Sequence, residues 1–210
     1  MKCIMLHGLG QSSASWKQTI DTMNNGVING GKDIDCPDLF TLVKDKEINY
    51  ADLYCAFSEY CKRYSEPIRI CGLSLGGILA LHYTIENSDK VNALALIGVQ
   101  YAMPKMLLKA QNIIFSMLPE KVFKKTGLKK KELIHLSDSM IDLDFSRELC
   151  KITCPALIIC GEKDRVNMKA ALRLKTMLPN AELNIIKKAG HEVNKDNPIR
   201  LGEVLNEFFG

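Results

Sequence analysis

The chain has 210 residues, of which 47% are hydrophobic and 25% are charged, and its formal net charge is +4. This length predicts one domain with a substantial core. The mild positive charge is far from the strongly basic footprint of nucleic-acid-binding proteins, and no run of about 18 apolar residues predicts a membrane-spanning helix. We therefore expect a small-molecule partner, and neither nucleic acid nor membrane.

The cysteines do not follow a pattern typical of disulfide frameworks or metal sites. The sequence has 8 cysteines but no C-x-x-C pair, and no cysteine–histidine cluster has zinc-finger spacing. Cys3, Cys71 and Cys160 lie within apolar runs, where a thiol behaves as a small hydrophobic group. The apolar start of the chain is also too short for a signal peptide. This usage predicts reduced thiols, no metal centre and a cytoplasmic location.

Short apolar runs alternate with longer amphipathic segments. Continuous apolar runs are typical of parallel strands that are buried on both faces, and we expect such strands at Cys3–Leu6, Ile34–Cys36, Ile68–Gly72, Val91–Ile97, Ala156–Cys160 and Leu183–Ile186. The periodicity between them predicts helices at about Tyr50–Tyr64, Leu75–Asn87 and Met168–Leu178, and one that starts at Asn197. The alternation predicts an α/β fold with a mostly parallel six-stranded sheet flanked by helices, and ligands at the carboxyl ends of its strands.

Residues 101–148 interrupt this alternation. They lack β-branched runs and are expected to form two or three short helices, a small helical lid inserted into a single domain of residues 1–210. Met103, Met106 and Phe115 are the candidate substrate-binding residues of this apolar segment. The alternative is a set of surplus core helices without a functional role. The segment also carries a lysine cluster, which is either a solvated face or a surface that attracts anionic substrates: Lys121, Lys124, Lys125, Lys129, Lys130 and Lys131.

The main chemical signal is the segment Gly72-Leu73-Ser74-Leu75-Gly76, which fits G-x-S-x-G. The motif alone is weak, but here it lies between an apolar strand and a helix, as a nucleophile elbow requires. A tight turn at this place exposes the Ser74 hydroxyl at the sheet edge. It also leaves the Leu75 N–H at a helix N-terminus, where the dipole favours negative charge. A serine N-cap with glycine-rich packing is the alternative.

A nucleophilic serine needs a base and an acid that orients the base. His191 follows the last predicted strand, and Asp164 follows the fifth, so both are expected at the same edge as Ser74. Asp164 is a better candidate than Glu162, because Glu162 lies within the turn. Two other histidines are expected to have no catalytic part, one as a packed helix residue and one as a solvated lid residue: His82 and His135.

The segment His7-Gly8-Leu9-Gly10 directly follows the first predicted strand. Its glycines allow the backbone to approach a substrate carbonyl closely. We expect the N–H groups of Leu9 and Leu75 to form an oxyanion hole, with His7 holding the loop through hydrogen bonds. A glycine-rich strand exit without this role is the alternative.

These motifs, together with their order and intervals, resemble the α/β-hydrolase superfamily, and the resemblance covers nearly the full length. The chain begins at what would be the third strand of larger members, so a six-stranded core without their first antiparallel hairpin is expected. The order of the candidates, Ser74, Asp164 and His191, is the order of that superfamily. The resemblance implies catalysis by these side chains without a cofactor.

The expected activity is hydrolysis of carboxylic esters with small acyl or aryl groups through an acyl-enzyme. Within the same fold, a thioesterase, a C–C bond hydrolase and a lyase like that of the menaquinone pathway are alternatives. A ligand receptor or interaction protein on a hydrolase scaffold is the alternative from another class. The substrate is expected to be an ester or thioester, and the protein a monomer or homodimer.

Overall fold

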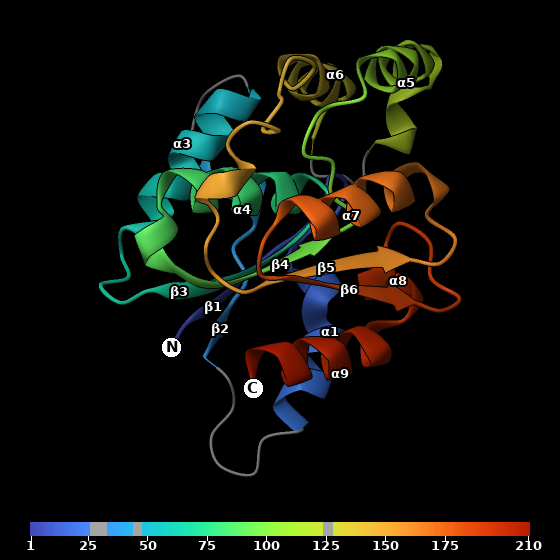
Figure 1. Cartoon of the computed structure of the whole chain (residues 1–210). Helices are drawn as coiled ribbons and strands as arrows, with labels where there is room; N and C mark the ends of the chain where they lie inside the picture. Colours follow the sequence, from blue (N-terminus) through green and yellow to red (C-terminus); the bar gives the residue numbers. More distant parts are fainter. Residues whose placement is uncertain (26–32, 44–47, 124–127) are drawn as a thin grey trace.

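The computed structural model describes residues 1–25, 33–43, 48–123 and 128–210. Six strands form one sheet in the order β2-β1-β3-β4-β5-β6, with every neighbouring pair parallel (Figure 1). This confirms the predicted six-stranded α/β sheet: two strands have the predicted bounds, and the other four differ at one end by one or two residues. The strands are β1 (Cys3–Leu6), β2 (Ile34–Asp35), β3 (Ile68–Leu73), β4 (Val91–Ile97), β5 (Ala156–Gly161) and β6 (Ala181–Ile186).

Helices cover both faces of the sheet. Helices α3, α4 and α7 lie above it in Figure 1, whereas α1 and α9 lie below it. The helices of the described residues are α1 (Lys17–Asn25), α2 (Leu39–Leu42), α3 (Tyr50–Cys61), α4 (Leu75–Glu86), α5 (Lys105–Met117), α6 (Lys130–Ser139), α7 (Arg165–Met177), α8 (Val193–Asp196) and α9 (Pro198–Phe209). Short 3-10 turns occur at Ser13–Trp16, Ser88–Lys90, Glu120–Val122 and Leu149–Lys151. No helix of the described residues is both long and apolar enough to cross a membrane.

The core consists of two apolar layers, one on each face of the sheet. Neighbouring strand residues alternate between them: Leu94 and Leu96 of β4 belong to the layer under α3, α4 and α7, and Ala95 and Ile97 belong to the layer against α1 and α9. Burial on both faces explains why the strand sequences are continuously apolar. The two rigid layers fix the sheet edge at which the candidate site residues emerge.

Residues 101–148 leave the sheet and return to it at one place. Ala102 and Asp144 form an antiparallel bridge, which lies between a hydrogen bond from Met103 N–H to the Leu143 carbonyl (2.9 Å) and one from Phe145 N–H to the Tyr101 carbonyl (2.8 Å). Between these ends, α5 and α6 lie beside each other above α4 and α7 (Figure 1). The paired ends are consistent with an inserted lid. The division into domain and lid remains a prediction.

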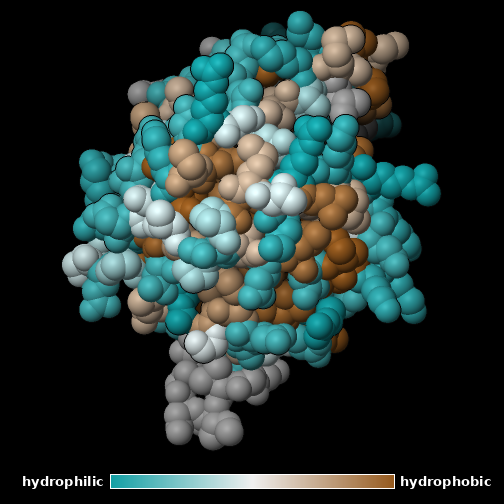
Figure 2. Space-filling model, in the orientation of Figure 1, coloured by the Kyte–Doolittle hydropathy of each residue, from teal (hydrophilic) through white to brown (hydrophobic). Residues whose placement is uncertain are grey.

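The outer face of α5 is apolar and exposed. Figure 2 shows hydrophobic surface at the upper right of the molecule, where α5 lies in Figure 1. The exposed side chains of this helix include Met106, Ile113, Ile114 and Met117. The apolar residues of this segment therefore divide into an inner and an outer set, which its composition alone could not separate.

Candidate active site

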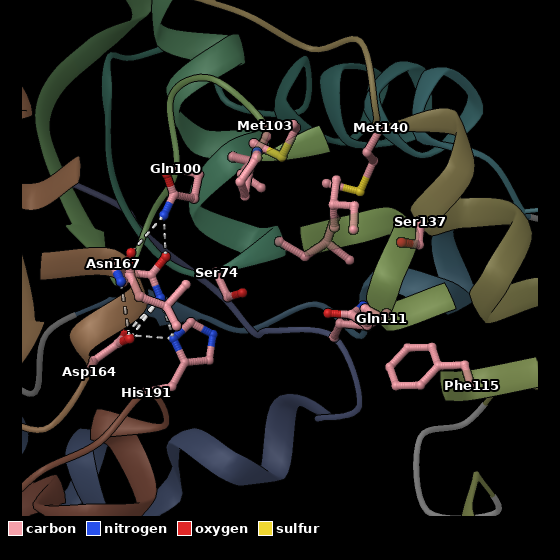
Figure 3. Close-up of a pocket in the computed structure, with 17 residues that line it drawn as sticks. Ser74, Gln100, Met103, Gln111, Phe115, Ser137, Met140, Asp164, Asn167 and His191 are labelled. Atoms are coloured by element: carbon pink, nitrogen blue, oxygen red, sulfur yellow. Dashed lines mark hydrogen bonds and ion pairs between the residues drawn. The ribbon is translucent and has the colours of Figure 1, made fainter. Parts of the chain in front are cut away.

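Ser74 lies at a strained turn between β3 and α4. Its φ of +52° and ψ of −116° lie outside the regions that L-residues normally adopt. Two glycines make this turn possible: a Cβ on Gly72 would lie 2.4 Å from the Gly76 carbonyl oxygen, and a Cβ on Gly76 would lie 2.4 Å from that of Leu6. The hydrogen bond from Ser74 N–H to the Ile97 carbonyl (2.9 Å) holds the turn against β4. The strain directs the hydroxyl away from the sheet and into the adjacent cavity (Figure 3).

Asp164 and His191 come from the loops after β5 and β6. The Nδ1–H of His191 donates to Asp164 Oδ2 at 2.8 Å, which leaves Nε2 of the ring free to accept a proton. The loops are held together by a hydrogen bond from Lys163 N–H to the Ala189 carbonyl (2.8 Å). Glu162, the other carboxylate of this turn, accepts instead from the Lys188 N–H (2.9 Å). The structure thus pairs the predicted aspartate, and not the glutamate, with the predicted histidine.

Two further side chains, which the sequence analysis did not identify, continue this hydrogen-bond chain. Asn167 in the first turn of α7 donates its amide to both carboxylate oxygens of Asp164, at 2.9 and 2.8 Å. Gln100, after β4, donates its amide to Asn167 Oδ1 at 2.8 Å (Figure 3). Asn167 is buried and fixed on both sides, so it holds the carboxylate in the plane that faces His191.

The electrostatic environment keeps Asp164 ionised. Burial raises the pKa of this carboxyl, but hydrogen bonds from His191 and Asn167 lower it, and the net pKa lies below its usual value. The Asp164 side chain is only 4% exposed, whereas that of His191 is 42% exposed. A buried carboxylate with these donors is suited to stabilise a positive charge that develops on the partly exposed imidazole.

Ser74, Asp164 and His191 line the same cavity, which has a volume of about 420 Å³ (Figure 3). The Ser74 hydroxyl makes no hydrogen bond to the described residues, and Ser74 lies beside the His191 ring in the view of Figure 3. Catalytic hydrogen bonds are often long in the absence of substrate and tighten on binding. Three side chains far apart in sequence are therefore brought to one edge of the sheet.

Leu9 and Leu75 border the cavity beside Ser74. Neither backbone N–H donates a hydrogen bond to another described residue, so both donors are available to a ligand. The preceding loop is fixed by His7, whose buried ring donates from Nδ1 to the Gly8 carbonyl (2.9 Å) and accepts the Leu39 N–H at Nε2 (3.0 Å). Burial also lowers the pKa of His7 and favours the neutral ring. His7 is thereby occupied in holding the loop.

The loop that carries Leu9 is also bound to the loop that carries His191. The Gln11 amide donates to the Glu192 carboxylate (2.8 Å) and accepts at its oxygen from Asn194 (2.9 Å). Burial raises the pKa of Glu192, but hydrogen bonds from Gln11 and Lys195 lower it below its usual value. The candidate base and the candidate oxyanion loop thus share one rigid network.

The structure places only some of the predicted substrate-binding residues at the cavity. Met103 and Phe115 line the cavity, but Met106 does not, and its side chain on α5 is 81% exposed. The structure therefore does not bring Met106 to the cavity with the other two residues. The lining also includes two polar residues that no motif indicated, Gln111 of α5 and Ser137 of α6. The remaining lining is mostly apolar and comprises Leu9, Leu75, Ile78, Gly98, Pro104, Leu108, Met140 and Val166.

The other residues singled out from the sequence lie away from the cavity. His82 packs in α4, with its ring centroid 3.8 Å from that of Tyr54, and His135 is exposed on α6. None of the described lysines lines the cavity. Lys130 donates to the carbonyls of Ser116 (3.1 Å) and Leu118 (2.9 Å), and so ties α6 to the end of α5. Two members of the lysine cluster, Lys124 and Lys125, lie outside the described residues.

Comparisons with known proteins agree with this architecture. No family model matches the chain. A curated protein of Cupriavidus pinatubonensis, named 2-hydroxy-6-oxononadienedioate/2-hydroxy-6-oxononatrienedioate hydrolase, is 24% identical over 251 residues, which cover 99% of this chain and 86% of that protein.

Solved structures show the same fold. MenH from S. aureus superposes with a TM-score of 0.82 at 16% identity, over 100% of this chain and 93% of that one. An esterase from Thermogutta terrifontis superposes with a TM-score of 0.76 at 16% identity, over 100% of this chain and 89% of that one. With this sheet order and these superpositions, the chain has the α/β-hydrolase fold.

Proposed function

We propose that the protein is a serine hydrolase that cleaves carboxylic esters of small acyl or aryl groups. The observation that carries this proposal is the 2.8 Å contact between His191 and a buried Asp164, beside a serine with φ of +52° in the same cavity. A strained serine, a partly exposed histidine and a buried acid together provide a nucleophile, a base and an orienting charge.

The reaction follows from these positions. Nε2 of His191 removes the proton from Ser74 as Oγ bonds to the ester carbonyl carbon, and the carbonyl oxygen becomes an oxyanion that accepts from the N–H groups of Leu9 and Leu75. His191 then gives the proton to the departing alcohol as the carbon–oxygen bond breaks. Water, deprotonated by the same ring, hydrolyses the acyl-enzyme and restores the Ser74 hydroxyl. Asp164 stabilises the imidazolium in both steps.

A second candidate is hydrolysis of a C–C bond in a keto acid. It is favoured by the full-length match to a protein named for 2-hydroxy-6-oxononadienedioate hydrolysis. The same side chains could serve this reaction, because a carbonyl carbon is again attacked and an oxyanion again forms. Apart from Asp164 and His191, the described cavity lining carries no ionisable side chain, which fits an ester better than a dicarboxylate, and we therefore place ester hydrolysis first.

The proposal is tested by active-site labelling together with turnover. A fluorophosphonate should modify Ser74, as located by mass spectrometry of peptides, and Ser74→Ala should lose both labelling and hydrolysis of p-nitrophenyl acetate, with kcat falling by about 10⁴-fold or more. Ser65→Ala, at an exposed serine far from the cavity, is the control and should keep both. Unchanged turnover in the Ser74 variant would refute the assignment.

Parallel assays with p-nitrophenyl esters and with a 2-hydroxy-6-oxo-dienoate separate the two candidate reactions. If the protein is an ester hydrolase, kcat/KM should be at least about tenfold higher for the better ester than for the dienoate. This ratio corresponds to about 1.4 kcal/mol of transition-state discrimination. The reverse order would favour C–C bond cleavage on the same side chains.

A further inference from the structure

Ser137 is a buried polar residue without a partner. It lies on α6, is only 3% exposed, and its Oγ has no hydrogen-bond partner among the described protein atoms, although it lines the cavity. A helical serine can usually satisfy its hydroxyl by bonding to a carbonyl of the preceding turn, as Ser139 does with Leu136 (2.7 Å). Burial of an unsatisfied hydroxyl is unfavourable. A ligand group that fills the cavity would remove this cost.

Gln111 offers a second free polar group at the same place. It lies on α5 and lines the cavity, and its side-chain amide makes no hydrogen bond within the described part of the chain. In Figure 3, Ser137 and Gln111 lie on the lid side of the cavity, and their polar ends turn toward the side that holds Ser74 and His191. The cavity is also lined by apolar side chains, among them Ile78, Leu108 and Met140.

The chemistry of this pair indicates a neutral ligand group. A hydroxyl and a primary amide both donate and accept hydrogen bonds, but neither carries a charge. Among the described lining residues, only His191 can carry a positive charge, and it belongs to the reacting side. A carboxylate buried beside Ser137 would lose hydration without gaining a counter-charge. A carbonyl or hydroxyl oxygen would instead receive donors from both residues.

We infer that Ser137 and Gln111 form a specificity subsite for a neutral carbonyl or hydroxyl oxygen, carried by the acyl part of the substrate away from the scissile bond. The inference rests on the proposed ester hydrolysis for its reaction. The site itself rests on the unpartnered hydroxyl and on the amide that faces the same space. It predicts that the preferred substrate is an oxo- or hydroxy-acyl ester and that a dicarboxylic half-ester is a poor one.

A matched set of esters tests the subsite: p-nitrophenyl hexanoate, its 4-oxo and 5-oxo derivatives, and the mono-p-nitrophenyl ester of adipic acid. The better oxo ester should exceed hexanoate in kcat/KM by about three- to tenfold, the range of one or two neutral hydrogen bonds, and the adipate ester should be the poorest substrate. Ser137→Ala and Gln111→Leu should each bring the oxo-to-hexanoate ratio toward one. Ser116→Ala, at an exposed serine of α5 outside the cavity, should keep the wild-type ratio.

Melting temperature gives an independent readout. Removal of an unsatisfied buried hydroxyl should raise the melting temperature of Ser137→Ala by about 2–4 °C in a chain of this size. A merely structural Ser137 predicts the opposite pattern: a lower melting temperature, and equal losses of turnover on every ester. That pattern, or a wild-type preference for the adipate ester, would overturn the inference.

Failure of the subsite and failure of the proposed function are distinguishable. Calorimetry on Ser74→Ala measures binding of the intact oxo and hexanoate esters without turnover. Turnover of the esters with no preference for the oxo group, in rate or in binding, would refute the subsite alone. Absence of turnover and of labelling at Ser74, with tighter binding of the oxo ester, would refute ester hydrolysis and leave the subsite standing.

Discussion

Asn167 is a positioning residue whose contribution can be measured. Its amide donates to both oxygens of Asp164, so Asn167→Ala should let the carboxylate rotate away from His191 and lower kcat by about tenfold, with little change in KM. Hydrogen bonds from Asn167 also help to lower the pKa of Asp164. Their removal raises that pKa, so activity that needs the ionised carboxylate should be lost at a higher pH as the solution is acidified. Steady-state kinetics at about pH 4 to 8 measure both effects.

A control separates positioning from general destabilisation. Asn92→Ala, at an exposed position of β4, removes the same functional group and should leave kinetics and acid profile unchanged. If Asn167→Ala lowered stability but kept the wild-type kcat per folded molecule and the wild-type acid profile, Asn167 would be only a packing residue.

Gly98 makes room for the pair of Asp164 and His191. Its φ is +58°, and a Cβ at this position would lie 3.0 Å from His191 Nδ1 and 3.3 Å from Asp164 Oδ2. Gly98→Ala should therefore displace the ring and lower kcat by about 100-fold, since a shift of about 1 Å has that effect. Gly202→Ala in α9, where a Cβ would meet Thr22 Cβ at 2.6 Å, is the control. The Gly202→Ala variant should have a lower melting temperature but the wild-type kcat per folded molecule. If Gly98→Ala also kept the wild-type kcat, this role of Gly98 would be contradicted.

The candidate residues that could be predicted from the sequence share one property. Ser74, Asp164 and His191 each follow a strand that apolar runs identify, so the topology of a parallel sheet implies a common edge. Asn167 and Gln111 are polar residues of helices and belong to no motif. Their roles depend on which face of a helix meets the cavity, and this is decided by tertiary packing. Gly98 gave no signal either, because its contribution is the absence of a side chain.

At the scale of elements, the edge strand β2 is held by a half-buried acid. Asp35 accepts hydrogen bonds from the hydroxyls of Tyr60 and Tyr64, near the end of α3. Burial raises the pKa of Asp35, but these hydrogen bonds and the charges of Lys2 and Arg63 lower it below its usual value. Because the folded pKa lies below that of the unfolded chain, about 3.9, the ionised form stabilises the fold above that pH, and this contribution is lost as the pH falls through the folded pKa.

Asp35→Asn should therefore reduce the free energy of unfolding near pH 7 by about 0.5 kcal/mol. This value lies at the low end of the range for a single hydrogen bond, because solvent screens a half-exposed group. The difference from wild type should shrink below about pH 4. Urea unfolding at several pH values measures it, with Asp89→Asn at an exposed position as the control. A difference that grew on acidification would contradict the assigned direction of the pKa.

The limits of the sequence-based prediction also differ between elements. The strands β3, β4 and β5 were predicted closely, because burial on both faces leaves a continuous apolar run. The start of β6 was predicted two residues late, because this edge strand carries exposed Glu182 among its apolar residues. Helix α2 has only four residues and was not predicted, since a single turn has no periodicity to detect.

At the scale of the whole molecule, the cavity is formed by two separate parts of the chain. The sheet edge provides the reacting side, and α5 and α6 provide the opposite side. The paired ends of residues 101–148 attach these two helices to the sheet. Selectivity for the acyl group should thus depend on inward-facing lid residues and not on the apolar character of the lid as a whole. Met103 and Met106 lie three residues apart and test this distinction, because one is 8% exposed and lines the cavity and the other is 81% exposed.

Met103→Ala should enlarge the cavity and raise the ratio of kcat/KM for p-nitrophenyl hexanoate over acetate by about tenfold, the lower range for methylene-scale changes in an apolar pocket. It should also cost about 2 kcal/mol of stability, because a buried side chain is truncated. Met106→Ala should change neither, since its side chain contacts mostly solvent. If Met106→Ala shifted the ratio as much as Met103→Ala, the outer face of α5 would have to turn inward during turnover. The acyl group would then be bound by a different arrangement of the lid from the one in Figure 3.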